Sequence, residues 1–251
     1  MKFDDFDRKM RVYEESLDQV IPPEVYLVAR LDGRSFSRLT HEVQRFDAPF
    51  DERFKNYMVE TTKQLMECGF DVVYGYTQSD EISLLLNFSS DTFGRKVRKL
   101  NSILAGTASA TISLLLGQVA VFDCRVIPLP NFTLVEDYFL WRQEDAHRNS
   151  LNSDCYWLLR NQGLTQTEAS EQLMGKSVAF KNELLFQNGT NYNETPLWQR
   201  CGIGMYYRKV MIDGYNPITN ETVKTERRRL YVDEQLTLGD DYRRLLRDIT
   251  R

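Results

Sequence analysis

The stretch VVYGYTQSDEISLLLNF, residues 72–88, contains two apolar segments of strand length around a short polar break. Val72–Tyr76 is rich in β-branched and aromatic residues, and Ile82–Phe88 is a second apolar run. The intervening residues 77–80 (TQSD) are all polar. Because two such runs around a short break are typical of a β-hairpin, we predict two adjacent antiparallel strands.

The segments on either side of this hairpin complete a regular order of strands and helices. Val25–Leu31 is another apolar run of strand length, and Asp51–Cys68 has apolar residues at the spacing of an amphipathic helix. Arg95–Leu116 has a helical pattern, and Val119–Ile127 is a fourth predicted strand. The order β-α-β-β-α-β predicts the split βαβ arrangement of ferredoxin-like folds.

This topology brings together acidic residues that are far apart in the sequence. The third strand lies between the first and the second and is antiparallel to both. The end of strand one and the turn between strands two and three therefore meet at one edge of the sheet. Asp32 ends the first strand, whereas Asp80 and Glu81 occupy that turn. We expect these carboxylates to converge.

Converging carboxylates indicate a cation site. They repel one another unless a cation lies between them, and hard oxygen ligands of this kind suit Mg²⁺. Two Mg²⁺ ions held by shared carboxylates would orient an attacking oxygen and stabilise a leaving phosphate, as in a polymerase palm. Gly33 permits a close approach of the backbone, so its carbonyl is available as a further ligand. Residues 32–34 (DGR) and 79–81 (SDE), each taken alone, would be ordinary polar turns.

The pattern changes after Pro128, where helices dominate. Thr165 and Glu168 have the spacing of a capping box at a helix start. We predict an α+β fold, with a palm-like catalytic core in residues 1–130 and a helical and β-hairpin part in residues 131–251 packed on it. The remaining predicted elements are a short N-terminal helix (Phe6–Asp18), helices over Asn131–Arg160, Thr165–Met174 and Val178–Phe186, strands over Tyr206–Ile212 and Thr222–Val232 joined by a loop with Asp213-Gly214, and a terminal helix (Asp240–Arg251).

Composition and charge exclude several classes of protein. With 42% hydrophobic and 27% charged residues, the chain is typical of a globular protein, which argues against general disorder. The formal charge of −4 excludes a surface that is basic overall. Four cysteines without a CxxC pair and two histidines argue against a zinc ribbon or a His-rich metal site.

The sequence also bears on location. Widely spaced cysteines are expected to be reduced and mostly in the core, which predicts a cytoplasmic protein. The first residues, MKFDDFDRKM, lack the apolar segment of a signal peptide. Asn101–Phe122 is uncharged and about as long as a membrane-spanning helix, but hydroxyl side chains interrupt it. We expect a core helix that runs into a buried strand, and no membrane partner.

Four sequence blocks together resemble one known family. In chain order they are RLDGRSF (residues 30–36), YTQSDEISLLL (76–86), WRQEDAHRNSLN (141–152) and KNELLF (181–186). Their order and spacing, from Phe3 to Ile212, resemble the tRNA(His) guanylyltransferase superfamily of 3′-to-5′ nucleic-acid polymerases.

The resemblance implies a polymerase-like palm and an enzyme that adds nucleotides to the 5′ end of tRNA. The tRNA 5′-monophosphate is first activated with ATP or GTP, and the 3′-hydroxyl of an incoming nucleoside triphosphate then attacks the activated phosphate. By the same resemblance Asp32, the Gly33 carbonyl and Asp80 hold two Mg²⁺ ions, and Glu81 supports the acidic cluster. We count Asp32, Asp80 and Glu81 as the catalytic residues. The resemblance also implies a homo-oligomer, namely a tetramer.

Two segments are expected to contact the bound nucleotide. The resemblance implies that residues at the ends of the first two strands line its triphosphate, namely Asp32, Gly33, Arg34, Ser35, Phe36, Ser37, Ser79 and Asp80. Arg95–Lys99 opens a helix that we place beside the acidic edge, where cations run against the helix dipole. Because basic side chains of this segment contact triphosphate in the family, Lys96 and Lys99 are further predicted nucleotide ligands.

The chain departs from the family pattern at two places. Ala48 stands where family members often have a lysine, and the block at His147–Ser153 (HRNSLNS) retains only part of the pattern of the guanylyltransferases proper. The second departure favours the guanylyltransferase-like branch of bacteria and archaea. That branch repairs truncated tRNA 5′ ends and uses the opposite strand as template.

Two other functions fit parts of the sequence. A palm-type nucleotidyl cyclase uses the same paired carboxylates but needs no RNA. A non-catalytic RNA-binding module would bind tRNA without Mg²⁺ and would tolerate Asp32→Ala. The four blocks and the long helical region after Pro128 favour the tRNA polymerase.

Overall fold

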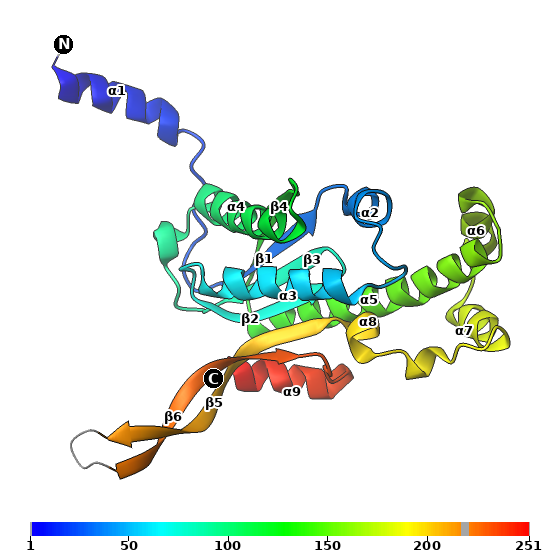
Figure 1. Ribbon diagram of the computed structural model, residues 1–251. Helices are drawn as coiled ribbons and strands as arrows, with labels where there is room; N and C mark the ends of the chain where they lie inside the picture. The colour runs from blue at the N-terminus through cyan, green and yellow to red at the C-terminus, as the bar shows by residue number, and fades with distance from the viewer. Residues whose placement is uncertain (1, 217–220, 251) are drawn as a thin grey trace.

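One antiparallel sheet lies between two layers of helices (Figure 1). The structure, a computed structural model, describes residues 2–216 and 221–250. The strands are β1 (Tyr26–Gly33), β2 (Val72–Gln78), β3 (Glu81–Leu86), β4 (Phe122–Leu129), β5 (Ile203–Asn216) and β6 (Glu221–Asp233). The helices are α1 (Phe3–Glu15), α2 (Phe36–Arg38), α3 (Glu52–Glu67), α4 (Val97–Leu116), α5 (Phe132–Asn161), α6 (Gln166–Leu173), α7 (Val178–Gln187), α8 (Leu197–Cys201) and α9 (Gly239–Ile249). Short π- and 3₁₀-turns cover Leu39–Val43, Thr92–Arg95 and Tyr192–Glu194.

The sheet has the topology that the order of strands predicts. Its spatial order is β4-β1-β3-β2-β5-β6, and β3 lies between β1 and β2, antiparallel to both. The ferredoxin-like core and the α+β class are therefore confirmed. β5 pairs with β2, so the C-terminal hairpin continues the same sheet.

The hairpin of β5 and β6 corrects one predicted turn. We expected a loop at Asp213-Gly214, but both residues lie within β5 and pair with Lys224 and Val223. The pairing runs on to Asn216 and Glu221, and the residues between them lie outside the described part of the chain. The hairpin extends beyond the helical layers (Figure 1), so Asp213 pairs with β6 without entering a core. Strand pairing therefore outweighs the tendency of Asp-Gly to form a turn.

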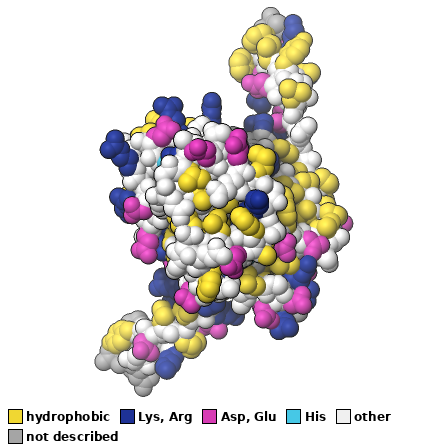
Figure 2. All heavy atoms as spheres, turned by 90° about the vertical axis from the view of Figure 1, so that its right-hand side faces the viewer, with side chains coloured by type: hydrophobic (Ala, Val, Ile, Leu, Met, Phe, Trp, Pro, Cys, Tyr) yellow, Lys and Arg dark blue, Asp and Glu magenta, His cyan; other side chains and the backbone are white. Residues whose placement is uncertain are grey.

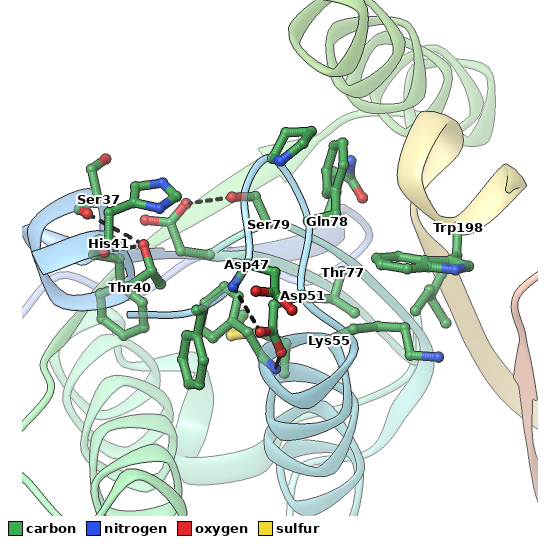
Figure 3. Close-up of a pocket in the computed structure, with 18 residues that line it drawn as sticks. Ser37, Thr40, His41, Asp47, Asp51, Lys55, Thr77, Gln78, Ser79 and Trp198 are labelled. Carbon is green, nitrogen blue, oxygen red and sulfur yellow. Dashed lines mark hydrogen bonds between the residues drawn. The ribbon is translucent and has the colours of Figure 1, made fainter. Parts of the chain in front are cut away.

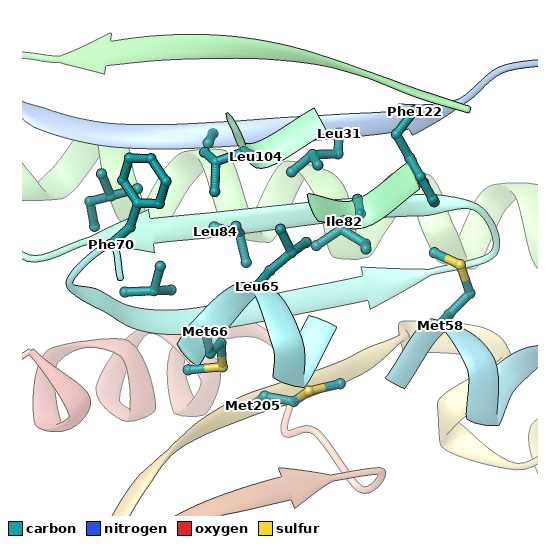
Figure 4. Packing of buried hydrophobic residues seen from close by; sticks show 14 of the residues in the cluster. Leu31, Met58, Leu65, Met66, Phe70, Ile82, Leu84, Leu104, Phe122 and Met205 are labelled. Carbon is teal, nitrogen blue, oxygen red and sulfur yellow. The ribbon is translucent and has the colours of Figure 1, made fainter. Parts of the chain in front are cut away.

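The helices cover both faces of the sheet, and alternate strand residues therefore enter two different cores. Figure 4 shows Leu31, Ile82 and Leu84 of the sheet packed against Leu65 of α3 and Leu104 of α4. On the opposite face, a second cluster joins the sheet to α5 and α9 and includes Val28, Tyr74, Leu85, Phe139 and Tyr242. Burial on both faces explains the nearly continuous apolar runs of β1 and β3.

The uncharged segment after Leu100 is α4, which buries one face against the sheet and leaves the other exposed, so the expectation of a core helix that runs into a buried strand is met only in part. α4 is long and apolar enough to cross a membrane by length and composition. Its inner residues are Leu100, Leu104, Ala108 and Ile112, all buried against the sheet. The helix begins at Val97, because Arg95 belongs to the preceding turn and donates to the carbonyls of Ser90 and Val25.

Short sequence patterns predicted where some helices begin or end. The Thr165 hydroxyl accepts from the amide of Glu168, whose carboxylate in turn accepts from the Thr165 amide, so the predicted capping box is confirmed. α1 spans Phe3–Glu15 instead of Phe6–Asp18, because Asp18 lies in the following link and forms ion pairs with Lys96 and Arg98.

Asp51 fixes the start of α3. Its carboxylate accepts from the amides of Arg53 at 2.7 Å and Asp47 at 2.8 Å, and the Arg53 guanidinium lies 2.6 Å away. The Arg53 hydrogen bond, with the backbone donors, lowers the pKa of this buried carboxyl to about 2. The cap thereby orders both the first turn of α3 and the loop that precedes it.

We predict that Asp51→Ala destabilises the protein by on the order of 1–2 kcal/mol at pH 7, because the first turn of α3 loses its cap. The folded-state pKa of Asp51 is depressed, so its contribution is present above the unfolded value near 4 and is lost as pH falls toward 2. Urea unfolding of both proteins at pH 7, 5, 4 and 3 measures the difference, which should narrow only below pH 4. Asp47→Ala, at an exposed neighbouring carboxylate, is the control; an equal loss there would contradict the assignment.

Candidate active site

Asp32 and Asp80 lie side by side at one edge of the sheet. The register of β1 and β3 places Asp32 opposite Glu81, and the amide of Gly33 donates to the Asp80 carbonyl at 3.1 Å. The predicted convergence of the carboxylates is therefore confirmed, whereas their chemical roles stay predictions. Asp123 of β4 lies opposite Asp32 on the other side, but its exposed carboxylate pairs with Arg125.

The carboxylate of Asp80 is half-buried, and it forms no ion pair in the described part of the chain. Burial raises its pKa to about 6, and the negative charge of Asp32 adds to the rise. Its side chain accepts a hydrogen bond from the Ser79 hydroxyl at 3.3 Å. A buried, ionised carboxylate is costly unless a cation or strong donors neutralise it. A cation bound at this edge would therefore stabilise the ionised form of Asp80.

The donors at this edge fit Mg²⁺ bound together with a substrate. Asp32, Asp80 and the Gly33 carbonyl are hard oxygen donors, the kind that Mg²⁺ prefers. In the described part of the chain, no group of three or more His, Cys, Asp or Glu side chains is arranged to hold a metal by itself. Because Mg²⁺ usually keeps waters and binds phosphates, a site with two carboxylates is sufficient when a triphosphate supplies further oxygens.

Glu81 is held between two arginines. Its Oε2 lies 2.6 Å from a terminal nitrogen of Arg30, and its Oε1 lies 2.8 Å from Nε of Arg142. Arg30 also lies 3.5 Å from the carboxylate of Asp32. Both carboxylate oxygens of Glu81 are thus engaged by guanidinium groups, so Glu81 orients positive charge beside the acidic pair. The supporting role expected of Glu81 stays a prediction.

Arg142 connects the acidic edge to α5. Its side chain is 6% exposed, and a terminal nitrogen lies 2.5 Å from Asp145. The guanidinium also lies over the ring of Trp141. Asp145 in turn pairs with the exposed Arg148 and accepts from Asn149 at 3.2 Å. A chain of alternating charges therefore runs from Asp32 to the surface of α5. We had assigned no role to Arg30, Arg142 or Asp145 from the sequence.

Two connected cavities adjoin this charge network. The larger, about 410 Å³, is lined by Asp32, Asp80 and Glu81 and by residues of α5. The smaller, about 100 Å³, lies between the segment after β1, the start of α3 and the end of β2 (Figure 3). Both cavities share Ser37, His41, Pro49, Phe50, Gln78, Ser79 and Asp80. The two cavities therefore adjoin each other at Asp80.

The turn after β1 is shaped by close packing. A Cβ on Gly33 would come within 2.5 Å of the Phe36 ring, so only glycine fits this position. Phe36 itself is buried and packs against Phe54 and Phe122, so it forms part of the cavity wall. Ser37 lines both cavities, whereas Arg34 and Ser35 line a separate surface hollow. The predicted nucleotide-binding residues of this turn therefore do not lie together. Ser37 faces the two cavities, whereas Arg34 and Ser35 lie at the separate hollow.

The placement of Lys96 and Lys99 beside the acidic edge was wrong. β3 begins at this edge and ends at the opposite one, so the helix that follows starts at the far end of the sheet. α4 has 20 residues, which makes it about 30 Å long. Its C-terminal end faces the edge, where Gln44 donates to the Leu116 carbonyl. Within one chain Lys96 instead pairs with Asp18 at 2.8 Å.

The lysine at the smaller cavity is one that the sequence reasoning missed. Ala48 precedes the loop proline, and Lys55 lies one turn into α3, where it lines the cavity. Its Nζ lies 3.1 Å from Glu234 and over the ring of Trp198. Figure 3 labels Lys55 and Trp198. A lysine four residues after a helix cap indicates little about function from the sequence. The direction of its side chain depends on how α3 packs against the sheet.

Comparison with known proteins covers most of the chain. Residues 7–130 match the tRNAHis guanylyltransferase family, and residues 133–237 match the Thg1 C-terminal domain. A probable tRNA(His) guanylyltransferase of Drosophila melanogaster is 34% identical over 207 residues, 78% of this chain and 71% of that protein. The tRNA(His) guanylyltransferase of Schizosaccharomyces pombe is 34% identical over 192 residues, 72% of this chain and 73% of that protein.

Solved structures share the fold. A bacterial tRNA(His) guanylyltransferase (Thg1)-like protein in complex with GTP superposes with a TM-score of 0.72 and 25% identity, over 98% of this chain and 99% of that one. The tRNA(His) guanylyltransferase of Saccharomyces cerevisiae gives a TM-score of 0.70 and 29% identity, over 77% of this chain and 90% of that one.

We predict that Arg142→Ala destabilises the protein by about 3–5 kcal/mol, because it leaves buried carboxylate charge on Glu81 and Asp145 without this partner. Arg148→Ala removes another arginine from the same Asp145, but its side chain is 73% exposed, so a loss below about 1 kcal/mol is expected. Chemical denaturation of the two variants beside wild type measures the difference. Equal losses would show that burial does not make the Arg142 pairs important.

Proposed function

The chain belongs to the tRNAHis guanylyltransferase family, and we propose that it repairs the 5′ end of tRNA by Mg²⁺-dependent, template-dependent nucleotide addition at Asp32 and Asp80. The family makes it a tRNA nucleotidyltransferase. The observation that carries the finer proposal is the desolvated Asp80 carboxylate beside Asp32, at the junction of two cavities.

The proposed reaction has two steps at this edge. In the first, an oxygen of the tRNA 5′-monophosphate attacks the α-phosphate of ATP or GTP, and pyrophosphate leaves. In the second, the 3′-hydroxyl of an incoming nucleoside triphosphate attacks the activated 5′ phosphate. The nucleoside monophosphate leaves, and a 3′-5′ phosphodiester bond forms. GTP bound to the bacterial structural relative supports a nucleoside triphosphate substrate.

Some residues of the candidate site would hold the metal, and others would contact the substrate. Asp32, Asp80 and the Gly33 carbonyl would hold Mg²⁺, which supplies electrostatic stabilisation of the attacked phosphate and of the leaving group. Arg30 and Arg142 stay oriented by Glu81 and face the larger cavity, where they limit the repulsion between phosphates and the acidic pair. The smaller cavity, walled by Phe50 and Trp198, has the flat apolar surfaces that suit a nucleobase.

The hairpin of β5 and β6 supports contact with tRNA phosphates. Arg208 lies directly opposite Arg229, and Lys209 lies opposite Arg228. Like charges in cross-strand pairs destabilise a hairpin unless an anion lies nearby. Here only part of the charge is offset, for example by Glu226 at 2.9 Å from Lys209. A polyanion such as the RNA backbone would offset the rest.

The altered block on α5 supports templated addition. Its residues Asn149, Ser150 and Ser153 line the larger cavity, so they face the substrate. Ser150 and Ser153 have short hydroxyl side chains. Because this wall is permissive, pairing with the opposite RNA strand is the stronger source of nucleotide selectivity. A mismatch costs on the order of 1–3 kcal/mol in protein–DNA sites, a scale that makes such control effective.

Three further parts of the proposal rest on indirect support. The division into residues 1–130 and 131–251 is supported by the boundary between the two family matches, 7–130 and 133–237. A homotetramer is supported by the family resemblance. A cytoplasmic location is supported by the four free cysteines.

We predict that Asp32→Ala and Asp80→Ala each reduce nucleotide addition to tRNA by roughly 100-fold or more, since each removes a ligand worth several kcal/mol of barrier. The assay uses a 5′-monophosphorylated tRNA lacking its first nucleotide, with ATP, each nucleoside triphosphate and saturating Mg²⁺. Asp123→Ala is the matched control, because Asp123 lies on the same edge but is 67% exposed in its side chain and pairs with Arg125. Wild-type rates in either test variant, with circular dichroism unchanged, would refute the metal assignment.

We also predict that the added nucleotide follows the template. A set of truncated tRNAs that differ only in the base opposite the gap should each receive the complementary nucleotide, because the wall at Ser150 and Ser153 does not select one base. Sequencing of the extended 5′ ends reads the outcome. Addition of guanylate to every tRNA in the set would show instead that the protein itself selects guanine.

A further inference from the structure

A further cavity shares a wall with the two cavities at the acidic edge. It measures about 360 Å³ and is lined by the second half of α5, by the chain from α7 to α8 and by the loop before α3. Pro49 and Phe50 of that loop also line both cavities at the acidic edge. We call this third space the outer cavity. The proposed reaction uses none of its residues from α5, α7 or α8.

The acidic side chain of the outer cavity has no partner. Asp154 of α5 is the only acidic residue among the described residues that line it, and its Oδ2 is buried without a hydrogen-bond partner. The carboxylate forms no ion pair in the described part of the chain, and burial raises its pKa to about 6. It is still mainly ionised at pH 7, so a charge is withdrawn from water without compensation. Because buried polar groups usually have a partner, this carboxylate calls for a ligand.

The charge of the outer cavity is unfavourable for anions. No lysine, arginine or histidine is among the described residues that line it, whereas Arg30 and Arg142 line the larger cavity at the acidic edge. Arg200 is engaged elsewhere, because its Nε donates to the Thr195 carbonyl at 2.9 Å. Figure 2 faces the end of the molecule that carries α6 and α7, and few Lys or Arg side chains lie at the centre of that face. A phosphate group would therefore meet uncompensated negative charge in this cavity.

The remaining walls favour an organic cation over a metal ion. Trp157 and Phe50 contribute aromatic rings, and Leu158 and Leu185 contribute aliphatic side chains. Mg²⁺ prefers several oxygen ligands and keeps its waters, so one carboxylate among apolar walls suits it poorly. An alkylammonium ion brings a charge for the carboxylate and a carbon chain for the apolar walls, and aromatic faces attract such ions further.

The buried oxygen of Asp154 favours an ammonium group over a nucleobase. Guanine presents two adjacent N–H donors and would need both carboxylate oxygens. Because Oδ2 is buried, a ligand in the cavity can reach only Oδ1. An ammonium group is a compact point charge that needs one oxygen. Its charge would also compensate the second oxygen across a short distance.

We propose that the outer cavity binds an alkylammonium ion, such as one end of a linear diamine or polyamine, with the ammonium group on Asp154 and the carbon chain along Trp157 and Leu185. The site lies outside the acidic edge and does not depend on the proposed reaction. Its test needs neither RNA nor nucleotide, so its failure is distinguishable from failure of the proposed function.

The first test measures binding of putrescine (1,4-diaminobutane), with 1,4-butanediol as the uncharged counterpart of equal chain length. In calorimetric titrations of the full chain at pH 7.5 and constant ionic strength, we expect putrescine to bind and butanediol not to bind. Asp154→Asn should weaken putrescine binding by roughly tenfold or more, because it removes the charge that the ammonium group meets. Glu144→Gln, at an exposed carboxylate of the same helix, should bind as wild type does. Equal affinities for wild type and Asp154→Asn would overturn the proposal.

The second test locates the bound ion. Asp154→Asn should fold, because it removes an uncompensated charge and keeps the shape of the side chain. The chain has three tryptophans, and Trp157 lines the outer cavity whereas Trp198 lines the smaller cavity at the acidic edge. With isotope-labelled tryptophan, putrescine should shift the indole N–H signal of Trp157, which Trp157→Phe identifies, and leave that of Trp141 in place.

The same spectra separate the other ligands. Asp154→Asn should abolish the shift of the Trp157 signal by putrescine. A shift of this signal with guanosine but not with putrescine would assign the outer cavity to a nucleobase and overturn the proposal. A shift with Mg²⁺ at the same ionic strength, but not with putrescine, would assign it to a metal ion and overturn the proposal as well.

Discussion

The antiparallel register between β1 and β3 is the constraint on which the rest of the site depends. It places Asp32 opposite Glu81, and the hydrogen bond from Gly33 to Asp80 draws the second carboxylate alongside. Negative charge concentrated at one edge is unfavourable unless it is compensated. Arg30 and Arg142 compensate Glu81, whereas Asp80 stays desolvated and receptive to a cation. The proposed binding of Mg²⁺ and phosphate rests on this charge imbalance, which the sheet imposes.

The C-terminal part of the chain is integral to this site. α5 supplies Arg142 and Asp145 to the charge network, and its next turns form one wall of the larger cavity. β5 extends the core sheet through its pairing with β2, and Trp198 of α8 closes the smaller cavity. Two segments that match separate family regions therefore build one candidate site, and neither encloses the cavities alone.

The two parts of the chain that project from the body have different surfaces. The hairpin of β5 and β6 carries basic cross-strand pairs, so its natural complement is a polyanion. α1 carries exposed apolar side chains, among them Phe3 and Tyr13. Each projection exposes groups that cost free energy in isolation.

The sequence by itself determined the order of elements, the strand order and the meeting of Asp32 with Asp80, because periodicity and the split βαβ topology are local or nearly universal rules. Only the tertiary structure decided which charges compensate one another. The pairing of Glu81 with Arg142 spans 61 residues of sequence and depends on how α5 packs across the sheet, which no local pattern encodes. The direction of α4, and with it the position of Lys96, follows from which edge β3 ends at. Asp213-Gly214 has the composition of a turn, yet pairing with β6 keeps it extended, because cooperative strand pairing outweighs the preference of two residues.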